Sequence, residues 1–327
     1  MSELKPLCIY HGNCADGFGA AWAVRRALGP DAVEFYAGVY QNDPPNAAGR
    51  HVIMVDFSYK RDVMIEFARH TQGVLLLDHH KSAMEDMFPG GANISLQHIQ
   101  DLREYSGRLS WNRFLGNTYQ DRCEGAPFGR IYALFDMNRS GAGMSWDFFH
   151  EGRDRPPLID RIEDRDLWRF AYQDTRAIQA SVFSYPYDFD TWDLLFKADL
   201  SVLRTEGEAI ERKHHKDIAE LVKAFRREMC IGGHWVPVAN LPYTLTSDAG
   251  HLMCEPYQSP NLAGEWVTPP FAACYWDTPD GRVFSLRSRD DGMDVSEIAK
   301  QYGGGGHKHA SGFRLSFDKA RELEVTP

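Results

Sequence analysis

Three short apolar segments of the chain each lead into side chains that bind metal ions or transfer protons. The segment at 7–10 is followed by His11 and Asp16, the segment at 52–55 by Asp56, and the segment at 73–77 by Asp78, His79 and His80. Short uninterrupted apolar runs are typical of strands buried on both faces of a parallel sheet. Ligands bind such sheets outside the carboxyl ends of the strands, so these donors are expected to gather at one edge. The pattern predicts the metal centre of an enzyme.

The chemistry that this mixture of side chains favours is hydrolysis of phosphate esters. Carboxylates and imidazoles bind the divalent metals that activate water. Two such ions about 3.5–4 Å apart can hold both the attacking and the leaving oxygen of an in-line displacement. Such a site needs a bridging carboxylate and terminal ligands on each side, and Asp164 is a further candidate from the distant segment 161–168. The alternative for any single residue is a cap or a buried hydrogen bond, but the whole set favours metal binding.

The composition is that of an ordinary soluble protein with room for two domains. The chain has 327 residues, of which 43% are hydrophobic and 25% charged. A net charge of −10 argues against binding to long duplex nucleic acid, where many basic side chains neutralise phosphates. The six cysteines show no CxxC spacing, which favours a reducing cytoplasm. We expect no signal peptide before the first strand and no membrane contact, since no apolar stretch approaches the roughly 18 residues of a membrane span.

The order of the predicted elements indicates an α/β protein with two domains. Helices predicted at 18–28 and 61–70 alternate with the apolar strands, as in right-handed βαβ units on a parallel sheet. Residues 90–128 lack a clear periodicity and are interpreted as an irregular insertion, and Ser140 is expected to open a further helix. The catalytic domain is therefore placed at residues 1–195.

The second half of the chain has a different pattern of predicted elements, with a long charged helix followed by short strands and turns. A long charged helix predicted at 200–227 forms the core of a helical connector, placed at 196–229. A smaller α/β domain is placed at 230–327, with the active site in the cleft between the domains. Its predicted elements are strands at 235–239, 271–276 and 283–287, a hairpin turn at Asp280-Gly281, and a helix at 295–302.

Four consecutive glycines, Gly303, Gly304, Gly305 and Gly306, follow this last helix. Glycine adopts positive φ readily, so successive N–H groups can turn inward and form a nest for an anion. His307 comes next and can donate to a phosphate oxygen, and Arg287 at a strand end can bind a phosphate in bidentate fashion. The alternative is a flexible surface turn. The combination favours a phosphate-binding site.

In this order along the chain, the motifs resemble those of the DHH phosphoesterase superfamily, which includes RecJ exonucleases, nanoRNA and pAp phosphatases, and family II pyrophosphatases. The four N-terminal motifs are His11-x-x-Cys14-x-Asp16-Gly17-Phe18, Val55-Asp56-Phe57-Ser58, Asp78-His79-His80-Lys81 and Glu163-Asp164-Arg165-Asp166. The segments that resemble the DHH-associated substrate domain are Ser285-Leu286-Arg287-Ser288, Asp294-Val295, the glycine run with His307, and Ala310-Ser311-Gly312. The resemblance spans nearly the whole chain.

The resemblance implies a role for each motif residue. The metal ligands would be His11, Asp16, Asp56, His79 and Asp164, with Asp56 bridging two ions. Those ions would be Mn²⁺-like, with Co²⁺, Zn²⁺ and Mg²⁺ as alternatives. Asp78 and His80 would orient the site and contact substrate, with His80 as the proton donor. Arg287, Ser288, the four glycines and His307 would bind the phosphate or nucleotide of the substrate.

One position departs from the family pattern. Cys14 stands where the first aspartate of an Asp-x-Asp pair is expected, and the spacing from His11 is one residue shorter than in the nanoRNase branch. A thiolate ligand would favour softer ions such as Zn²⁺ or Co²⁺. A thiol packed in the core would leave one ion with fewer protein ligands. The second alternative is slightly favoured because cysteine is often buried.

These observations predict a metal-dependent cytoplasmic phosphodiesterase that cleaves short oligonucleotides or small phosphonucleotides by means of metal-activated water. Three alternatives stay open at this stage. They are a 3′-phosphatase acting on pAp, a pyrophosphatase or polyphosphatase, and a non-catalytic nucleotide-binding protein in which Cys14 has disabled the metal centre. The sequence does not predict an oligomeric state.

Overall fold

The computed structural model of the chain describes residues 4–40, 42–89, 99–102, 109–123, 130–256 and 267–323. The chain divides into two compact units, Met1–Ile210 and Glu211–Pro327. Each unit has its own sheet and its own apolar core. The expected mixed α/β architecture is confirmed, whereas the expected domain boundaries near residues 195 and 229 stay a prediction.

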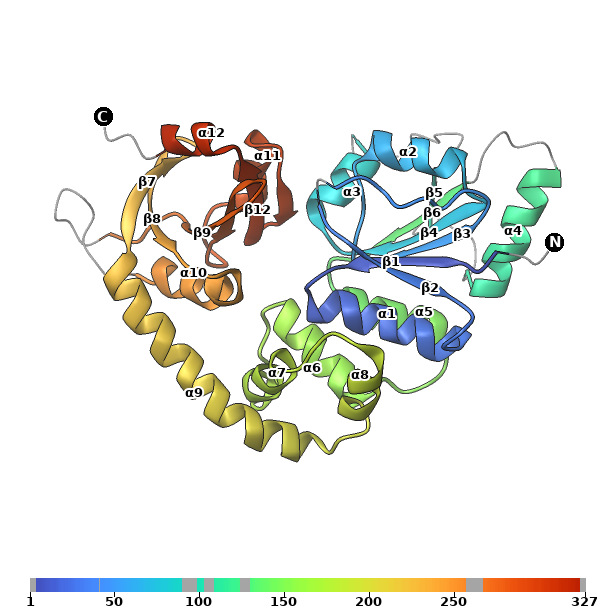
Figure 1. Cartoon of the computed structure of the whole chain (residues 1–327), viewed down its shortest axis with the longest axis horizontal. Coiled ribbons are helices and arrows are strands. Elements are labelled where there is room, and N and C mark those ends of the chain that lie inside the picture. The colour runs from blue at the N-terminus through green and yellow to red at the C-terminus, as the bar shows by residue number, and fades with distance from the viewer. Residues whose placement is uncertain are drawn as a thin grey trace. The chain divides into compact units, whose positions relative to one another are not determined.

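The first unit alternates strands and helices and ends in a group of helices (Figure 1). Its elements are β1 (Leu7–His11), α1 (Ala15–Leu28), β2 (Glu34–Gly38), β3 (His51–Val55), α2 (Arg61–Arg69), β4 (Gly73–Asp78), α3 (Lys81–Met87), β5 (Ile99–Asp101), α4 (Trp111–Cys123), β6 (Ile131–Phe135), α5 (Gly141–Phe149), α6 (Pro157–Asp166), α7 (Thr175–Phe183) and α8 (Phe189–Leu195). Helix α9 (Leu200–Phe225) follows, and the division between the two units falls within it.

The six strands of this unit form a parallel sheet in the order β2-β1-β3-β4-β6-β5. The three strands predicted from the apolar runs are therefore neighbours, and their carboxyl ends lie at the same edge. The sequence analysis did not predict β2 or β6. Strand β2 is short and mostly exposed, because it forms one edge of the sheet.

Successive side chains along the strands point to opposite faces of the sheet and pack into two separate apolar cores. Ile9, Met54 and Leu76 face one side, where α2 and α3 pack against them. Their neighbours Ile53 and Leu75 face the other side, which α1, α4 and α5 cover. Because both faces are covered, the strands are apolar throughout, as buried parallel strands must be.

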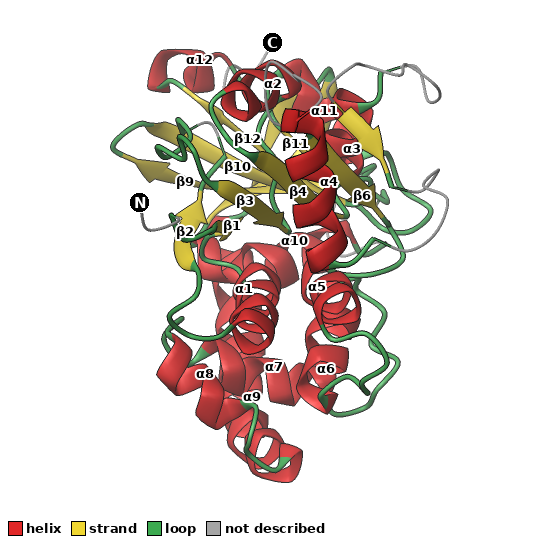
Figure 2. Cartoon of the chain, turned by 90° about the vertical axis from the view of Figure 1, so that its right-hand side faces the viewer, coloured by secondary structure: helices red, strands yellow, loops and turns green. Residues whose placement is uncertain are grey.

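Helices α6, α7 and α8 lie beyond α1 and α5, on the side away from the sheet (Figures 1 and 2). Phe18 and Trp22 of α1 reach this helical layer and pack in a core with the fully buried Trp192 of α8. The indole of Trp22 also donates to Asp193 at 2.8 Å. Helix α1 thus packs one apolar face against the sheet and another against the helical layer. This explains why it is buried along most of its length.

The interpretation of residues 90–128 as an irregular insertion is wrong in part. Helix α4 covers 13 residues of this segment, and β5 adds a parallel strand to the edge of the sheet. The buried ring of Phe114 anchors α4 to the core. The helix was not predicted although Trp111, Phe114 and Leu115 follow helical spacing, because Gly116 and the polar residues of its second half weaken the pattern. The remainder of the segment (90–98, 103–108 and 124–128) lies outside the described residues.

The second unit is built on a mixed sheet in the order β11-β12-β10-β9-β8-β7. Its elements are β7 (Arg227–Ile231), β8 (His234–Asn240), the 3₁₀ helix η1 (Tyr243–Leu245), α10 (Thr246–Cys254), β9 (Ala272–Thr278), β10 (Gly281–Arg287), α11 (Val295–Gln301), β11 (Gly305–His307), β12 (Ala310–Leu315) and α12 (Phe317–Glu322). The predicted hairpin is confirmed, since Gly281 of β10 pairs with Thr278 of β9. No helix in the described part of the chain has the length and apolar character needed to cross a membrane.

Candidate metal centre

The predicted ligands of the three strand ends lie at one edge of the parallel sheet. His11 is the last residue of β1, Asp56 directly follows β3, and Asp78 is the last residue of β4. The backbone of Asp56 is left-handed, with φ of 56°, and its N–H donates to the carbonyl of Leu77. Non-glycine residues seldom adopt this conformation, and such strain concentrates at functional sites. The turn at Asp56 ends the strand and exposes its carboxylate to the neighbouring ligands.

The carboxylate of Asp56 is shared between two histidines. Its Oδ2 lies 3.5 Å from Nδ1 of His11, and its Oδ1 lies 3.0 Å from Nε2 of His79. Burial alone would raise the pKa of Asp56, but hydrogen bonds from His11 and His79 outweigh burial and hold that pKa well below its usual range. Asp56 is therefore an ionised carboxylate with one oxygen facing each side of the site.

Three carboxylates surround Nε2 of His79. Besides the contact with Asp56, this nitrogen lies 3.6 Å from Oδ2 of Asp16 and 3.5 Å from Oδ2 of Asp166. Burial lowers the pKa of His79, but the surrounding acids raise it to about 10. The imidazole thus carries a proton and supplies the positive charge that so many close carboxylates require.

Asp16 is held by the beginning of a second helix. The N–H groups of Gly141 and Ala142, at the start of α5, donate to its two oxygens at 2.6 and 2.9 Å. A helix N-terminus favours an anion in this position. Burial and the nearby Asp56 and Asp166 nevertheless raise the pKa of Asp16 well above its usual value.

Gly141 permits the close approach of α5 to the acidic cluster. A Cβ at this position would lie 2.3 Å from Cβ of Asp56 and 2.9 Å from Oδ2 of Asp16. The sequence analysis recognised the start of a helix at Ser140 but assigned no role to Gly141. The signal was present, since the run Ser140-Gly141-Ala142-Gly143 resembles an anion-binding helix start.

Asp78 orients both histidines that follow it. Its Oδ1 accepts the backbone N–H of His79 at 2.7 Å and contacts Nδ1 of His80 at 2.7 Å. Burial lowers the pKa of His80, but Asp78 outweighs burial and raises it. Asp78 is wholly buried, and its contacts fix the backbone of His79 and the ring of His80.

Cys14 lies beside the site, immediately before α1. Its Sγ and one ligand atom each of His11 and Asp56 lie within 4.8 Å of one another. Burial raises the pKa of the thiol well above its usual value, and Asp56, Asp166 and Asp16 raise it further. The side chain therefore faces the acidic cluster instead of a purely apolar core.

Asp166, and not the predicted Asp164, meets the other ligands. The carboxylate of Asp164 accepts the N–H groups of Ala171 and Tyr172 and the hydroxyl of Thr175, at 2.5 to 3.2 Å. It therefore holds the loop that follows α6. Two residues later, Asp166 ends the helix and turns towards His79. Sequence reasoning could not separate the two, because the segment 163–166 offers three acids in four residues.

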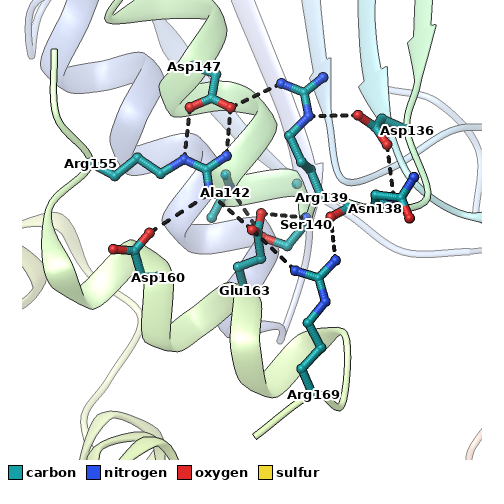
Figure 3. Close-up of polar contacts among 12 residues, drawn as sticks. Asp136, Asn138, Arg139, Ser140, Ala142, Asp147, Arg155, Asp160, Glu163 and Arg169 are labelled. Carbon is teal, nitrogen blue, oxygen red and sulfur yellow. Dashed lines mark hydrogen bonds and ion pairs between the residues drawn. The ribbon is translucent and has the colours of Figure 1, made fainter. Parts of the chain in front are cut away.

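Glu163 connects the start of α5 to a group of arginines (Figure 3). Its Oε2 accepts the N–H of Ser140 at 3.0 Å, and its Oε1 accepts from Arg155 at 3.0 Å. Arg155 also binds Asp147 of α5 through two hydrogen bonds. The network thereby fixes α5 against α6, and hence the two N–H groups that hold Asp16. It continues through Arg139 to Asp136, at the end of β6.

The donor set fits divalent metal ions. Among the described residues of the first unit, three groups of side chains bring their ligand atoms close enough to share an ion. Those three are His11, Cys14 and Asp56; Asp16, His79 and Asp166; and Asp56, Asp78 and His80. Oδ2 of Asp78 and Oδ2 of Asp166 are buried and lack hydrogen-bond partners among the described residues, as expected for atoms that face a cation.

Two of the predicted substrate-binding residues lie on the same face of the sheet in the second unit. Arg287 of β10 and His307 of β11 both pair with Ala310 of the intervening strand β12. Residues directly opposite one another project to the same face of a sheet. The guanidinium of Arg287 also donates to the hydroxyls of Ser247 and Ser285 at 2.8 and 3.0 Å, which fixes its direction.

The glycine run does not form the expected four-residue nest. The N–H groups of Gly303 and Gly304 donate to carbonyls of α11 and end that helix, and Gly305 and Gly306 belong to strand β11. Glycine is needed because Gly303 has φ of 77° and a Cβ on Gly304 would lie 2.1 Å from the carbonyl oxygen of Gly312. Helix capping and close strand packing therefore account for these residues.

Ser288 is also occupied by the fold. Its hydroxyl donates to the carbonyl of Met293 at 2.7 Å and lies 2.9 Å from Nδ1 of His309. The side chain is buried. It supports the loop after β10 and does not project from the surface.

Relatives of the chain were found by sequence, although no family model matches it. An uncharacterised protein, R106, of Acanthamoeba polyphaga mimivirus is 27% identical, over 94% of this chain and 67% of its own length. The oligoribonuclease NrnB of Bacillus subtilis is 22% identical, over 97% of this chain and 74% of its own length.

Solved structures with 12% identity also align with 98% of the chain. They include a pGpG-specific phosphodiesterase, PggH, from Vibrio cholerae, with a TM-score of 0.42 and 96% of its chain covered. Another is the RecJ protein of Thermus thermophilus in complex with Mn²⁺, with a TM-score of 0.45 and 51% of its chain covered. The sequence relative NrnB is by its name an oligoribonuclease, which agrees with the predicted resemblance to the DHH phosphoesterase superfamily.

Replacing Glu163 by alanine tests the role of the arginine network. Glu163→Ala leaves the N–H of Ser140 and part of Arg155 without an acceptor, so we expect the free energy of unfolding to fall by about 1–3 kcal/mol. Urea denaturation measures this change. Asp160→Ala is the matched control, since Asp160 lies 3.9 Å from Arg155 and is more exposed than Glu163. Equal midpoints for Glu163→Ala and the wild type would show that the network does not stabilise the unit.

Proposed function

We propose that the chain is a metal-dependent phosphodiesterase that uses two divalent ions in its N-terminal unit. The observation that carries this proposal is the position of Asp56, whose two oxygens face different histidines at 3.5 and 3.0 Å. A carboxylate in this position can bridge two ions. The protonated imidazole of His79 supplies one positive charge, which does not balance the buried carboxylates of Asp16 and Asp166 as well as that of Asp56. Two divalent ions would balance this negative charge.

Each ion would have its own terminal ligands. His11 would serve one ion, while Asp16, His79 and Asp166 would serve the other. Asp166 replaces Asp164 in this assignment, because the carboxylate of Asp164 holds a loop. When bound, two such ions lower the pKa of a water molecule and neutralise charge on the phosphate. Mn²⁺ is the proposed ion for the position formed by Asp16, His79 and Asp166, since sites rich in carboxylates suit it.

His80 is the proposed proton donor to the leaving oxygen. Asp78 holds one ring nitrogen of His80 at 2.7 Å and so fixes the plane of the ring. A general acid needs such an orientation before its pKa matters. Asp16 is positioned by α5 and the Glu163 network, which keeps the ligand geometry rigid.

The proposed substrates are short oligonucleotides or small phosphonucleotides. Arg287 and His307 would bind a phosphate or base of the substrate, because they share one face of the second sheet. The net charge of −10 disfavours processive action on long chains. The sequence relative NrnB is an oligoribonuclease, which supports the same size class.

Incubation with Mn²⁺ and a panel of substrates tests this proposal. The panel contains dinucleotides, longer single-stranded oligonucleotides, pAp, pyrophosphate and cyclic dinucleotides. We expect mononucleotides from the linear dinucleotides at the highest kcat/KM. Preferred release of inorganic phosphate from pAp or pyrophosphate would replace the phosphodiesterase proposal by one of its alternatives, and no turnover of any compound would contradict it.

Asp56→Ala should abolish catalysis without unfolding the protein. We expect kcat to fall by at least about 100-fold, since even groups that only support metal ligands are worth about 10–100-fold. Bound metal, measured by plasma emission, should fall in parallel. Circular dichroism provides the control for folding. Near-wild-type activity and metal content would exclude Asp56 as the bridging ligand.

Asp166→Asn and Asp164→Asn distinguish the two candidate ligands of α6. We expect Asp166→Asn to weaken Mn²⁺ binding at least about tenfold by calorimetry, with little change in stability. Asp164→Asn should instead destabilise the fold and leave the affinity of the folded protein for Mn²⁺ nearly unchanged, because the carboxylate of Asp164 holds the loop after α6 and the start of α7. The reverse pattern would restore the assignment of Asp164.

Arg287→Ala tests the proposed substrate contact in the second unit. We expect KM for a dinucleotide to rise about tenfold or more at nearly constant kcat, since a contact made equally in the ground and transition states is lost. Steady-state kinetics measures both parameters, and Arg314→Ala on β12 is a matched control. A fall in kcat at constant KM would place Arg287 at the reacting phosphate.

A further inference from the structure

The three groups of potential ligands in the first unit differ in their chemistry. Cys14, with His11 and Asp56, offers sulfur, nitrogen and oxygen, whereas Asp16, His79 and Asp166 offer one nitrogen and two oxygens. These two groups share no residue, and Asp56 of the first group connects them, since its Oδ2 faces His11 and its Oδ1 faces His79 of the second group. The centre is therefore asymmetric, with a soft donor on one side only.

The position of Cys14 is set by the local backbone. Asn13 adopts a left-handed conformation with φ of 56°, and Cys14 then serves as the N-cap residue of the 14-residue helix α1. Gly17, in the first turn, packs so closely that a Cβ would lie 2.3 Å from the carbonyl oxygen of His11. This turn brings residue 14 back to the end of β1.

A second observation concerns a buried carboxylate in the ligand group that shares Asp56 with the group of Cys14. Oδ2 of Asp78 belongs to a wholly buried residue and lacks a hydrogen-bond partner among the described residues. Asp78 shares a ligand group with His80 and Asp56, and Asp56 in turn belongs to the group that contains Cys14. Buried polar atoms in native proteins seldom lack partners without a functional reason.

We propose that Cys14 coordinates, as a thiolate, the divalent ion that His11 and Asp56 bind. This position therefore selects Zn²⁺ or Co²⁺, and the Asp16, His79 and Asp166 position takes a harder ion such as Mn²⁺. Softer ions prefer sulfur ligands, and a bound Zn²⁺ holds sulfur at about 2.3 Å and imidazole nitrogen at about 2.0–2.1 Å. The thiol loses its proton to solvent when the ion binds, so the step releases one proton per ion. The inference rests on the proposed metal centre and deepens it.

Titration of the metal-free protein with Co²⁺ tests the inference directly. A Co²⁺–thiolate bond gives a near-ultraviolet charge-transfer band that nitrogen and oxygen ligands do not give. We expect this band in the wild type, rising to a plateau, and we expect Cys14→Ser to abolish it while the visible bands of bound Co²⁺ persist. Cys123→Ser is the matched control, because Cys123 is exposed on α4 and should leave the spectrum unchanged.

Cys14→Asp provides a second variant in case the serine variant does not fold. It should bind two ions without the charge-transfer band and shift the metal preference at least about tenfold from Zn²⁺ towards Mn²⁺, measured by competition in calorimetry. Absence of the band in Co²⁺-loaded wild type, or its persistence in Cys14→Ser or Cys14→Asp, would overturn the inference. These readouts do not depend on turnover, so the inference can fail while the proposed phosphodiesterase activity stands.

Discussion

Buried carboxylates meet at one edge of the parallel sheet, and their mutual repulsion must be compensated. Asp16, Asp56 and Asp166 surround one imidazole nitrogen of His79 at 3.0 to 3.6 Å. Like charges gathered around one atom in a buried site disfavour joint ionisation. Burial and the neighbouring Asp56 and Asp166 accordingly raise the pKa of Asp16. Divalent ions relieve this repulsion more completely than a single proton, which makes metal binding the expected purpose of the arrangement.

The rest of the first unit holds these acids in place against their repulsion. The parallel sheet supplies His11, Asp56 and Asp78 from neighbouring strand ends. Helix α5 contributes N–H groups that bind Asp16, and Glu163 fixes the start of α5 through its bond to Ser140. The helices beyond α1 and α5 therefore belong to the site as much as the sheet does, although they supply one ligand only.

Apolar runs and motif order were sufficient to predict the parallel sheet and most of the acidic and imidazole side chains that gather at its edge. The strands at 7–10, 52–55 and 73–77 are buried on both faces and thus continuously apolar, which is a strong signal. The helix that contains Asp164 and Asp166 offers no such signal, because only the orientation of its last turn decides which acid faces His79. The glycines at 303–306 misled the analysis for a related reason, since caps, tight packing and anion nests all require glycine. Strands β2 and β12 were missed because their patterns are partly exposed.

The central claim is that Asp56 bridges two divalent ions. Electron paramagnetic resonance of the wild-type protein saturated with Mn²⁺ tests it most directly. Two ions about 3.5–4 Å apart that share a carboxylate are magnetically coupled. The account predicts the spectrum of a coupled pair at two bound equivalents. The six-line spectrum of isolated Mn²⁺ at two bound equivalents would contradict it.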